Sequence, residues 1–170
     1  MKQLLFLAVL FTSLMACGQQ DKSKRPSPPA LAKETTSNGV TISIDYSQPG
    51  VKGRTIGKDL EPMDGKIWRT GANEATVFEI NKAVKVEGKA LPAGKYGLFT
   101  LKNGDDWTVI FNKTWNQEGA FDYKEADDAL RVKVKGKKAD KFTERMTFLV
   151  SKAGIVTLLW GDHKVDFSVK

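Results

Sequence analysis

The sequence predicts an all-β protein, an antiparallel β-sandwich of jelly-roll or immunoglobulin-like type with about eight or nine strands and one short helix. Apolar and polar residues alternate with a period of two in many short runs, which is the pattern of half-buried strands. Clusters of Gly, Asn, Asp and Ser separate these runs at regular intervals, as they do between the strands of a sandwich. Only one segment, residues 122–129, has a helical composition, and it is at most two turns long.

The first expected strand covers residues 40–46, where Val40, Ile42, Ile44 and Tyr46 share one face. An Asn-Gly pair at 103–104 separates two apolar runs and predicts a hairpin with a tight turn. A second hairpin should join the two apolar runs on either side of residues 151–154. We expect a turn at residues 161–163. The predicted strands are residues 40–46, 75–80, 83–87, 95–101, 107–111, 130–135, 143–150, 155–160 and 164–169.

The N-terminus has the features of a secretory signal peptide over residues 1–16. Lys2 supplies one positive charge, and an apolar run follows at residues 4–11. A run of this length is too short to span a bilayer, which takes about 20 apolar residues. Leu14-Met15-Ala16-Cys17-Gly18 resembles the lipobox of bacterial lipoproteins. The resemblance implies that a diacylglycerol alkylates the Cys17 thiol, that the chain is cut before Cys17, and that the new amine is acylated by a chain such as palmitate.

Cys17 is the only cysteine of the chain, so it has no partner for an intrachain disulfide, and lipid modification explains it best. An ordinary cleaved signal peptide that happens to end before a cysteine is the alternative. A lipid anchor would hold the protein on a membrane of the cell envelope. In well-studied bacteria, an Asp directly after the lipidated cysteine is associated with retention in the inner membrane. Gly18 occupies this position here, which favours the outer membrane.

The remaining chain divides into a spacer and a domain. Residues 17–37 read as the lipidated cysteine followed by a disordered linker that is polar, charged and rich in proline. Residues 38–170 then form a single β-sandwich domain, a size that can bury a core without disulfides. The formal net charge of the chain is +7, but its lysines are spread along strands and turns. This distribution argues against nucleic acid as a partner.

Three strings of residues resemble a known bacterial family, the domain of unknown function DUF2911. They are Val-Lys-Gly-Arg at 51–54, Trp-Arg-Thr-Gly-Ala-Asn-Glu-Ala-Thr at 68–76, and Leu-Pro-Ala-Gly-x-Tyr at 91–96. The resemblance covers most of residues 38–170. It implies a β-rich fold in an exported or envelope protein, and it brings no established activity.

The second string contains the best candidate for a ligand site. A planar Trp together with Arg, Asn and Glu suits a polar ligand such as a sugar, because it offers a flat apolar face and hydrogen-bonding groups. Two further residues from neighbouring loops complete the candidate site, whose members are Arg54, Trp68, Arg69, Asn73, Glu74 and Asn112. In the alternative, structural interpretation, either arginine pairs with Glu74, Asn73 caps a turn and Trp68 plugs one end of the sandwich.

Other groups that could support catalysis have weaker patterns. His163, the only histidine, is expected to be a solvated turn residue, because zinc sites need three or four protein ligands. The acidic pairs at 105–106 and 127–128 read as solvated turns, and the Gly-x-Ser-x-Gly motif of serine hydrolases is absent. We therefore expect neither a metal nor another cofactor.

These observations favour an envelope-anchored lipoprotein whose domain binds a glycan, a small polar ligand or an envelope protein without catalysis. Two alternatives remain open. One is a hydrolase in which Glu74 acts as acid or base while Arg54 or Arg69 stabilises developing negative charge. The other is a purely structural lipoprotein in which the same residues form a stabilising network.

Overall fold

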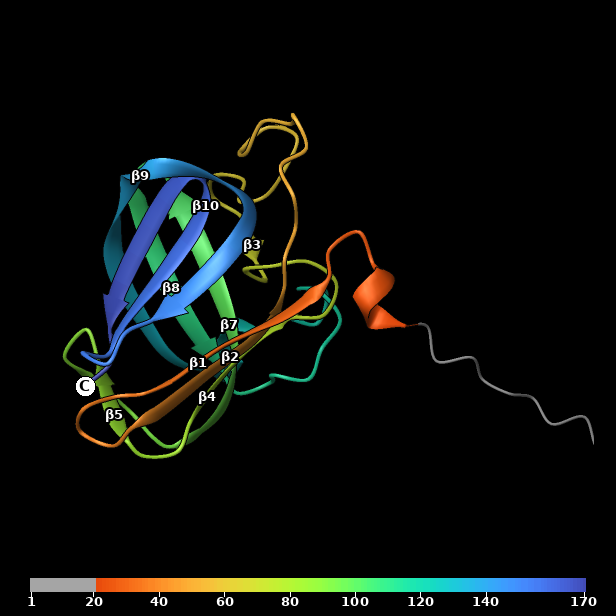
Figure 1. Cartoon of the computed structure of the whole chain (residues 1–170). Helices are drawn as coiled ribbons and strands as arrows, with labels where there is room; N and C mark the ends of the chain where they lie inside the picture. Colours follow the sequence, from red (N-terminus) through yellow and green to blue (C-terminus); the bar gives the residue numbers. More distant parts are fainter. Residues whose placement is uncertain (1–20) are drawn as a thin grey trace, which may run out of the picture.

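The computed structural model describes residues 21–170, and this part of the chain is all-β (Figure 1). The predicted signal peptide and Cys17 lie outside the described residues. The elements in chain order are η1 (Lys22–Lys24), β1 (Pro29–Thr35), β2 (Thr41–Ser47), β3 (Ile67–Trp68), β4 (Thr76–Ile80), β5 (Val84–Val86), β6 (Lys89–Leu91), β7 (Gly94–Asn103), β8 (Asp106–Asn112), η2 (Glu125–Asp127), β9 (Asp128–Val150) and β10 (Ile155–Ser168), where η denotes a 3-10 helix.

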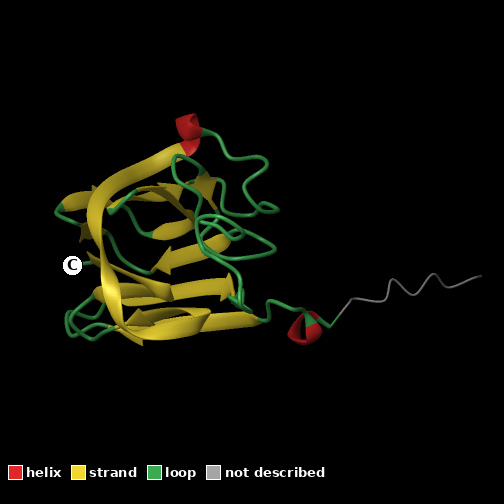
Figure 2. Ribbon diagram, turned by 90° about the horizontal axis from the view of Figure 1, so that it is seen from above, coloured by secondary structure: helices red, strands yellow, loops and turns green. Residues whose placement is uncertain are grey.

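One curled antiparallel sheet makes up most of the molecule. Its strand order is β1-β2-β4-β7-β8-β9-β10, with β3 paired to β7 at one side, while β5 and β6 form a small second sheet. Strand β9 is long enough to pair with β8 through residues 128–135 and with β10 through residues 136–150. The two halves of β9 therefore carry the sheet around the core, as Figure 2 shows from above.

The curled sheet also meets itself at one end. The chain that leaves β2 runs antiparallel to β9, where the Val51 amide donates to the Glu144 carbonyl (2.9 Å) and the Met146 amide donates to the Pro49 carbonyl (3.0 Å). Paired backbone groups at this point leave no open sheet edge there.

Alternating apolar residues of the strands fill the space inside the curl. Ile42 and Ile44 of β2 are completely buried, as are the rings of Phe78 and Phe111, which pack edge to face with centroids 5.0 Å apart. A smaller apolar cluster of Ala75, Phe99 and Ile110 lies on the outer face of β7 and β8, where the loop between β8 and η2 covers it. The main core thus joins the strands, and the second cluster fixes that loop.

Both the all-β class and the antiparallel pairing are confirmed. The hairpin at Asn103-Gly104 joins β7 to β8, and Gly104 has the positive φ of 59° that such turns require. The second hairpin joins β9 to β10 at the expected residues. Within residues 21–170, no helix has the length and apolar composition that crossing a membrane requires.

The ordered domain begins earlier than predicted. Residues 29–35, assigned to the linker, form β1 and pair with β2 along their whole length. Ala30, Ala32 and Glu34 occupy the less exposed face of this edge strand, and Leu31 points outward with 62% of its surface exposed. Small inward residues and a proline at the first position hide the period of two, although both are acceptable on an edge strand.

Three other local predictions are wrong. The expected helix at 122–129 is reduced to the single turn η2, because Asp128 already belongs to β9 and pairs with Asn112. The expected turn at 161–163 is instead part of β10, which continues through shifts of register on either side of Gly161. Likewise, the two strands predicted at 130–135 and 143–150 are one strand, β9.

The C-terminus is paired with the small second sheet. Lys85 and Lys170 exchange both of their backbone hydrogen bonds, at 2.6 and 2.9 Å, and the Glu87 amide donates to the Ser168 carbonyl. Val169 lies between these bonds with 1% of its surface exposed. The last residues of the chain therefore belong to the core.

Candidate functional site

The structure separates the six predicted site residues into three groups. Arg54, Trp68 and Arg69 line one cavity. Asn73 and Glu74 instead bind the segment that precedes β1. Asn112 is buried elsewhere.

The first group surrounds a cavity of about 210 Å³, which we call the arginine pocket. It lies between the loop that follows β2, the turn that follows β3, and β10. Residues that line it include Ser27, Arg54, Leu60, Glu61, Trp68, Arg69 and Trp160.

A tight turn after β3 fixes Trp68 and Arg69 at this pocket. Trp68 pairs with Thr100 of β7, and its indole Nε1 donates to the carbonyl of Gly71 (3.1 Å). Gly71 is needed here, because a Cβ would lie 2.8 Å from the hydroxyl of Thr76. Trp68 keeps only 3% of its surface exposed, so its ring closes the pocket floor and offers no open face for stacking. The structural interpretation of Trp68 fits this environment better than stacking on a sugar.

The two arginines of the pocket have no acidic partner among residues 21–170. Arg54 donates from Nε to the Val51 carbonyl (3.1 Å) and from Nη2 to the Gly50 carbonyl (2.8 Å). The Nε of Arg69 is buried and has no hydrogen-bond partner. Buried polar atoms in native proteins are nearly always bonded to protein, water or ligand. The expected pair of either arginine with Glu74 is not formed.

Glu74 is bound by two cationic residues of the N-terminal segment. Nη1 of Arg25 lies 2.9 Å from both carboxylate oxygens, and Nζ of Lys22 lies 3.0 Å from Oε1. The neighbouring Asn73 donates from its amide to the Ser27 carbonyl (3.0 Å). Residues 22–28, which we call the strap, are therefore docked on the loop between β3 and β4.

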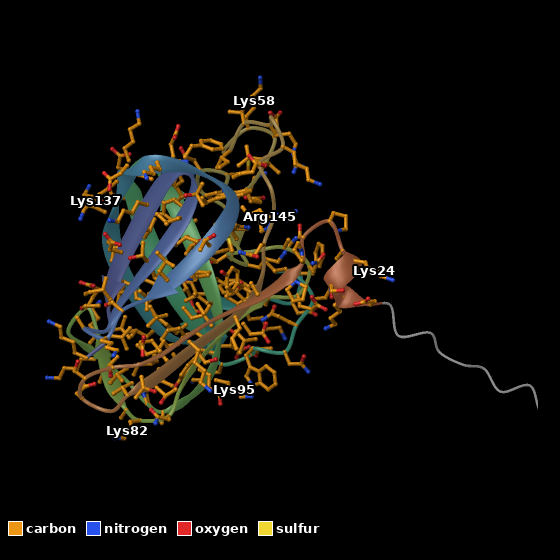
Figure 3. The ribbon with its side chains drawn as sticks, viewed as in Figure 1. Lys24, Lys58, Lys82, Lys95, Lys137 and Arg145 are labelled. Atoms are coloured by element: carbon orange, nitrogen blue, oxygen red, sulfur yellow. The ribbon has the colours of Figure 1, made fainter. Side chains whose placement is uncertain are left out.

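A third contact holds the strap from the side of β9. Nη1 of Arg145 lies 3.4 Å from the Pro26 carbonyl and 3.3 Å from the Gln48 carbonyl. Figure 3 labels Lys24 in the strap and Arg145 on β9. Because Ser27 also lines the arginine pocket, the docked strap forms part of the wall of that pocket.

The charged partners keep Glu74 ionised. Burial alone would raise its pKa, but the backbone N–H of Glu74 together with Arg25 and Lys22 outweighs burial and lowers the pKa to about 2. A carboxylate with such a pKa holds no proton near neutral pH and is a weak base. Glu74 is therefore suited to an ionic contact and poorly suited to general acid or base catalysis.

Asn112 organises a loop and does not reach the pocket. Its amide nitrogen donates to the Lys124 carbonyl (2.9 Å) and to Oδ1 of Asp128 (2.8 Å), and its oxygen accepts from the Thr114 amide (2.9 Å). All of its hydrogen-bonding groups are used inside the protein, and none of its surface is exposed. Asn112 thus holds both ends of the loop between β8 and η2.

His163 also lies in an environment that differs from the predicted one. It is part of β10 and half-buried, with its ring centroid 6.0 Å from that of Trp107. Burial and then the charge of Lys102 lower its pKa. Among residues 21–170 there is no group of three or more His, Cys, Asp or Glu side chains placed to hold a metal ion.

Several residues of the site had no signal in the sequence. Lys22 and Arg25 belong to a segment that reads as a linker, and Trp160 reads as an ordinary core residue. The loop after β8 adds Gly119 and Phe121: a Cβ on Gly119 would lie 3.1 Å from the Phe121 ring and 3.5 Å from Nη1 of Arg69. Only the folded chain brings these residues to the loop between β3 and β4.

Fold and site together define a class of small all-β domain with a docked N-terminal strap beside an arginine-lined pocket. A family model described as "Protein of unknown function (DUF2911)" matches residues 27–169, and the chain belongs to this family. The match begins within the strap, two residues before β1, in agreement with the early start of the ordered domain. No curated protein and no solved structure matches the chain.

Proposed function

We infer that the protein is a lipid-anchored envelope protein whose domain binds the anionic group of a small polar ligand or glycan in the arginine pocket, without catalysis. The observation that carries this proposal is the pair of arginines, Arg54 and Arg69, which line one cavity and form no ion pair in the described part of the chain. The one acidic residue of the lining, Glu61, accepts a hydrogen bond from the Met63 amide (2.7 Å) instead. Guanidinium groups bind carboxylate or phosphate through paired, charge-assisted hydrogen bonds.

The size of the pocket supports binding of one charged group. Its volume of about 210 Å³ is below the ~300–1,000 Å³ of sites that enclose drug-sized ligands. A carboxylate or phosphate group, with the part of the ligand next to it, suits such a cavity. The buried floor formed by Trp68 and Trp160 would keep water away from the contact and strengthen it.

The hydrolase alternative has less support from this geometry. It requires Glu74 to face Arg54 or Arg69, but Glu74 is bound to Lys22 and Arg25 and lies outside the lining of the arginine pocket. The structural alternative accounts for the strap and for Asn112, but it does not explain why the buried Nε of Arg69 has no hydrogen-bond partner.

Binding of simple anions tests the pocket. We expect inorganic phosphate or glucuronate to shift the NMR signals of the Arg54 and Arg69 side chains in the mature protein. Arg69→Gln should weaken binding by about tenfold or more, since a hydrogen bond to a charged group contributes ~1.5–3 kcal/mol. Lys58→Gln, at an exposed residue that does not line the pocket, is the charge-matched control and should bind as the wild type does. Equal affinity of all three proteins would refute the pocket assignment.

A separate measurement tests the anchor. Mass spectrometry of the mature protein should find an N-terminal Cys17 that carries acyl chains, and Cys17→Ser should move the protein from the membrane fraction to the soluble fraction. Two or more buried chains are enough for stable attachment. An unmodified thiol at Cys17 would refute the anchor and leave the pocket experiment unaffected.

A further inference from the structure

We propose that the loop between β8 and η2 and the docked strap form a surface that lies on the lipid bilayer, with Trp115 and Phe121 at the level of the lipid headgroups. This inference rests on the lipid anchor proposed above. Its other supports are the place where the strap docks and the exposed aromatic residues beside it.

Docking of the strap shortens the connection between the proposed anchor and the domain. An extended chain spans at most ~3.6 Å per residue, so the four steps from Cys17 to Asp21 reach about 14 Å. Without the docked strap, the free chain would extend to Pro29, and its reach would rise to about 43 Å. The contacts of Glu74 and Asn73 therefore decide whether the domain is held close to the bilayer.

The same contacts decide which end of the domain faces the bilayer. The strap (orange) and the loop after β8 (teal) both lie toward the right-hand side of the molecule in Figure 1. Backbone hydrogen bonds join the loop after β8 directly to the loop between β3 and β4, on which the strap is docked. The Ala75 amide donates to the Gln117 carbonyl (3.0 Å), and the Gly119 amide donates to the Asn73 carbonyl (3.2 Å). An isolated bridge also pairs Glu74 with Glu118.

This end carries aromatic residues that the fold leaves in water. Phe121 has 86% of its surface exposed and Trp115 has 38%, whereas the other three tryptophans are at most 3% exposed. Tryptophan and phenylalanine rings that protrude from a surface are favourable at the interface between headgroups and acyl chains. The nearby cation Lys95 lies 5.3 Å from the Trp115 ring, where it would meet lipid phosphate.

Apolar contact, and not net charge, is the expected source of attraction. The basic residues of this surface, Lys22, Lys24 and Arg25 of the strap with Lys113 and Lys124 of the loop, are nearly balanced by four acidic residues of the loop and η2, Glu118, Asp122, Glu125 and Asp127. Attachment should therefore depend little on anionic lipids, in contrast to that of a polybasic surface.

Quenching of Trp115 fluorescence by brominated lipid tests the orientation. The mature lipoprotein is reconstituted in phosphatidylcholine vesicles with and without brominated acyl chains. We expect the wild-type emission to be quenched and Trp115→Phe to lose most of this quenching, because the remaining tryptophans are buried. Glu74→Gln should reduce the quenching at least twofold through release of the strap. Asp140→Asn, a charge-matched change on β9, should leave it unchanged.

The outcomes separate this proposal from the proposed function. Protein that carries acyl chains and floats with the vesicles, but whose Trp115 is not quenched, would overturn the orientation and leave the anchor intact. Such a result would mean that the aromatic surface faces away from the bilayer, toward water or a protein partner. Protein that lacks acyl chains and does not float would overturn the anchor itself, and the orientation with it.

Discussion

Glu74 binds Arg25, a residue 49 positions earlier in the chain, and this contact turns a segment with linker composition into part of the folded domain. The side chain of Arg25 is 24% exposed and that of Glu74 is 40% exposed, so water still screens the pair. Such a contact positions the strap more than it stabilises the domain, because partly exposed ion pairs contribute ~0–1 kcal/mol.

Glu74→Gln is expected to release the strap with little loss of stability. Amide hydrogen exchange of residues 22–28 should become faster, while the exchange of β7 and β8 should not change. The folded-state pKa of Glu74 is about 2, lower than its ordinary value of 4.5, so the contact is fully present above pH 4.5 and is lost as the pH falls toward 2. Wild-type strap protection that stays constant down to pH 2 would contradict this role.

Loss of the buried Asn112 side chain should cost stability. Asn112→Ala would leave the Thr114 amide and the Lys124 carbonyl without their partner in a part-buried site. We expect a loss of about 1–3 kcal/mol in the free energy of unfolding, measured by urea denaturation. The exposed Asn116→Ala, in the same loop, is the control and should change the free energy by less than about 0.5 kcal/mol. Similar losses in the two variants would show that the buried network is not the cause.

At the scale of elements, β9 is the strand that closes the fold. Its first half pairs with β8 and its second half with β10, so one continuous strand belongs to both sides of the curl. The strand bends past the indole of Trp107 at Gly136, whose amide donates to the Asp105 carbonyl (2.8 Å). The polar residues that follow Gly136 interrupt the apolar alternation, which explains why the sequence indicates two separate strands.

Gly136→Ala tests this bend. A Cβ at residue 136 would lie 2.5 Å from Nε1 of Trp107, so the indole or the strand must shift. We expect a loss of about 1–3 kcal/mol, the usual cost of overpacking, which lowers the melting temperature by several degrees. Gly50→Ala is the matched control, because its Cβ would meet no atom closer than 3.4 Å. An unchanged melting temperature for Gly136→Ala would show that Trp107 moves freely.

At the scale of the whole molecule, the sequence predicts local structure well and predicts the site only in part. Alternation and turn residues give the strands and both hairpins, because these depend on neighbours in the chain. The candidate residues from Trp68 to Glu74 are adjacent in sequence, but the turn at Gly71 sends Arg69 into the pocket and Glu74 toward the strap. The sequence does not predict the ion pair between Glu74 and Arg25, because a basic residue in an apparent linker could pair with any of many acidic residues.

Burial is the other property that single residues do not reveal. Asn112 follows an apolar strand and reads as an exposed polar group at its end, but it is covered once the loop after β8 returns to β9. Trp68 reads as a stacking platform, and its orientation depends on the hydrogen bond to Gly71 that forms only in the folded turn.

The pairing of Lys170 with Lys85 has a consequence for biosynthesis. Residues 168–170 are synthesised after every other element of the described fold, and the small second sheet lacks its neighbour until they are in place. Contacts between distant parts of the chain also make folding slow. A chain that stops before Val169 therefore lacks a buried residue of the core and the backbone partner of Lys85, and we expect it to be more sensitive to proteolysis.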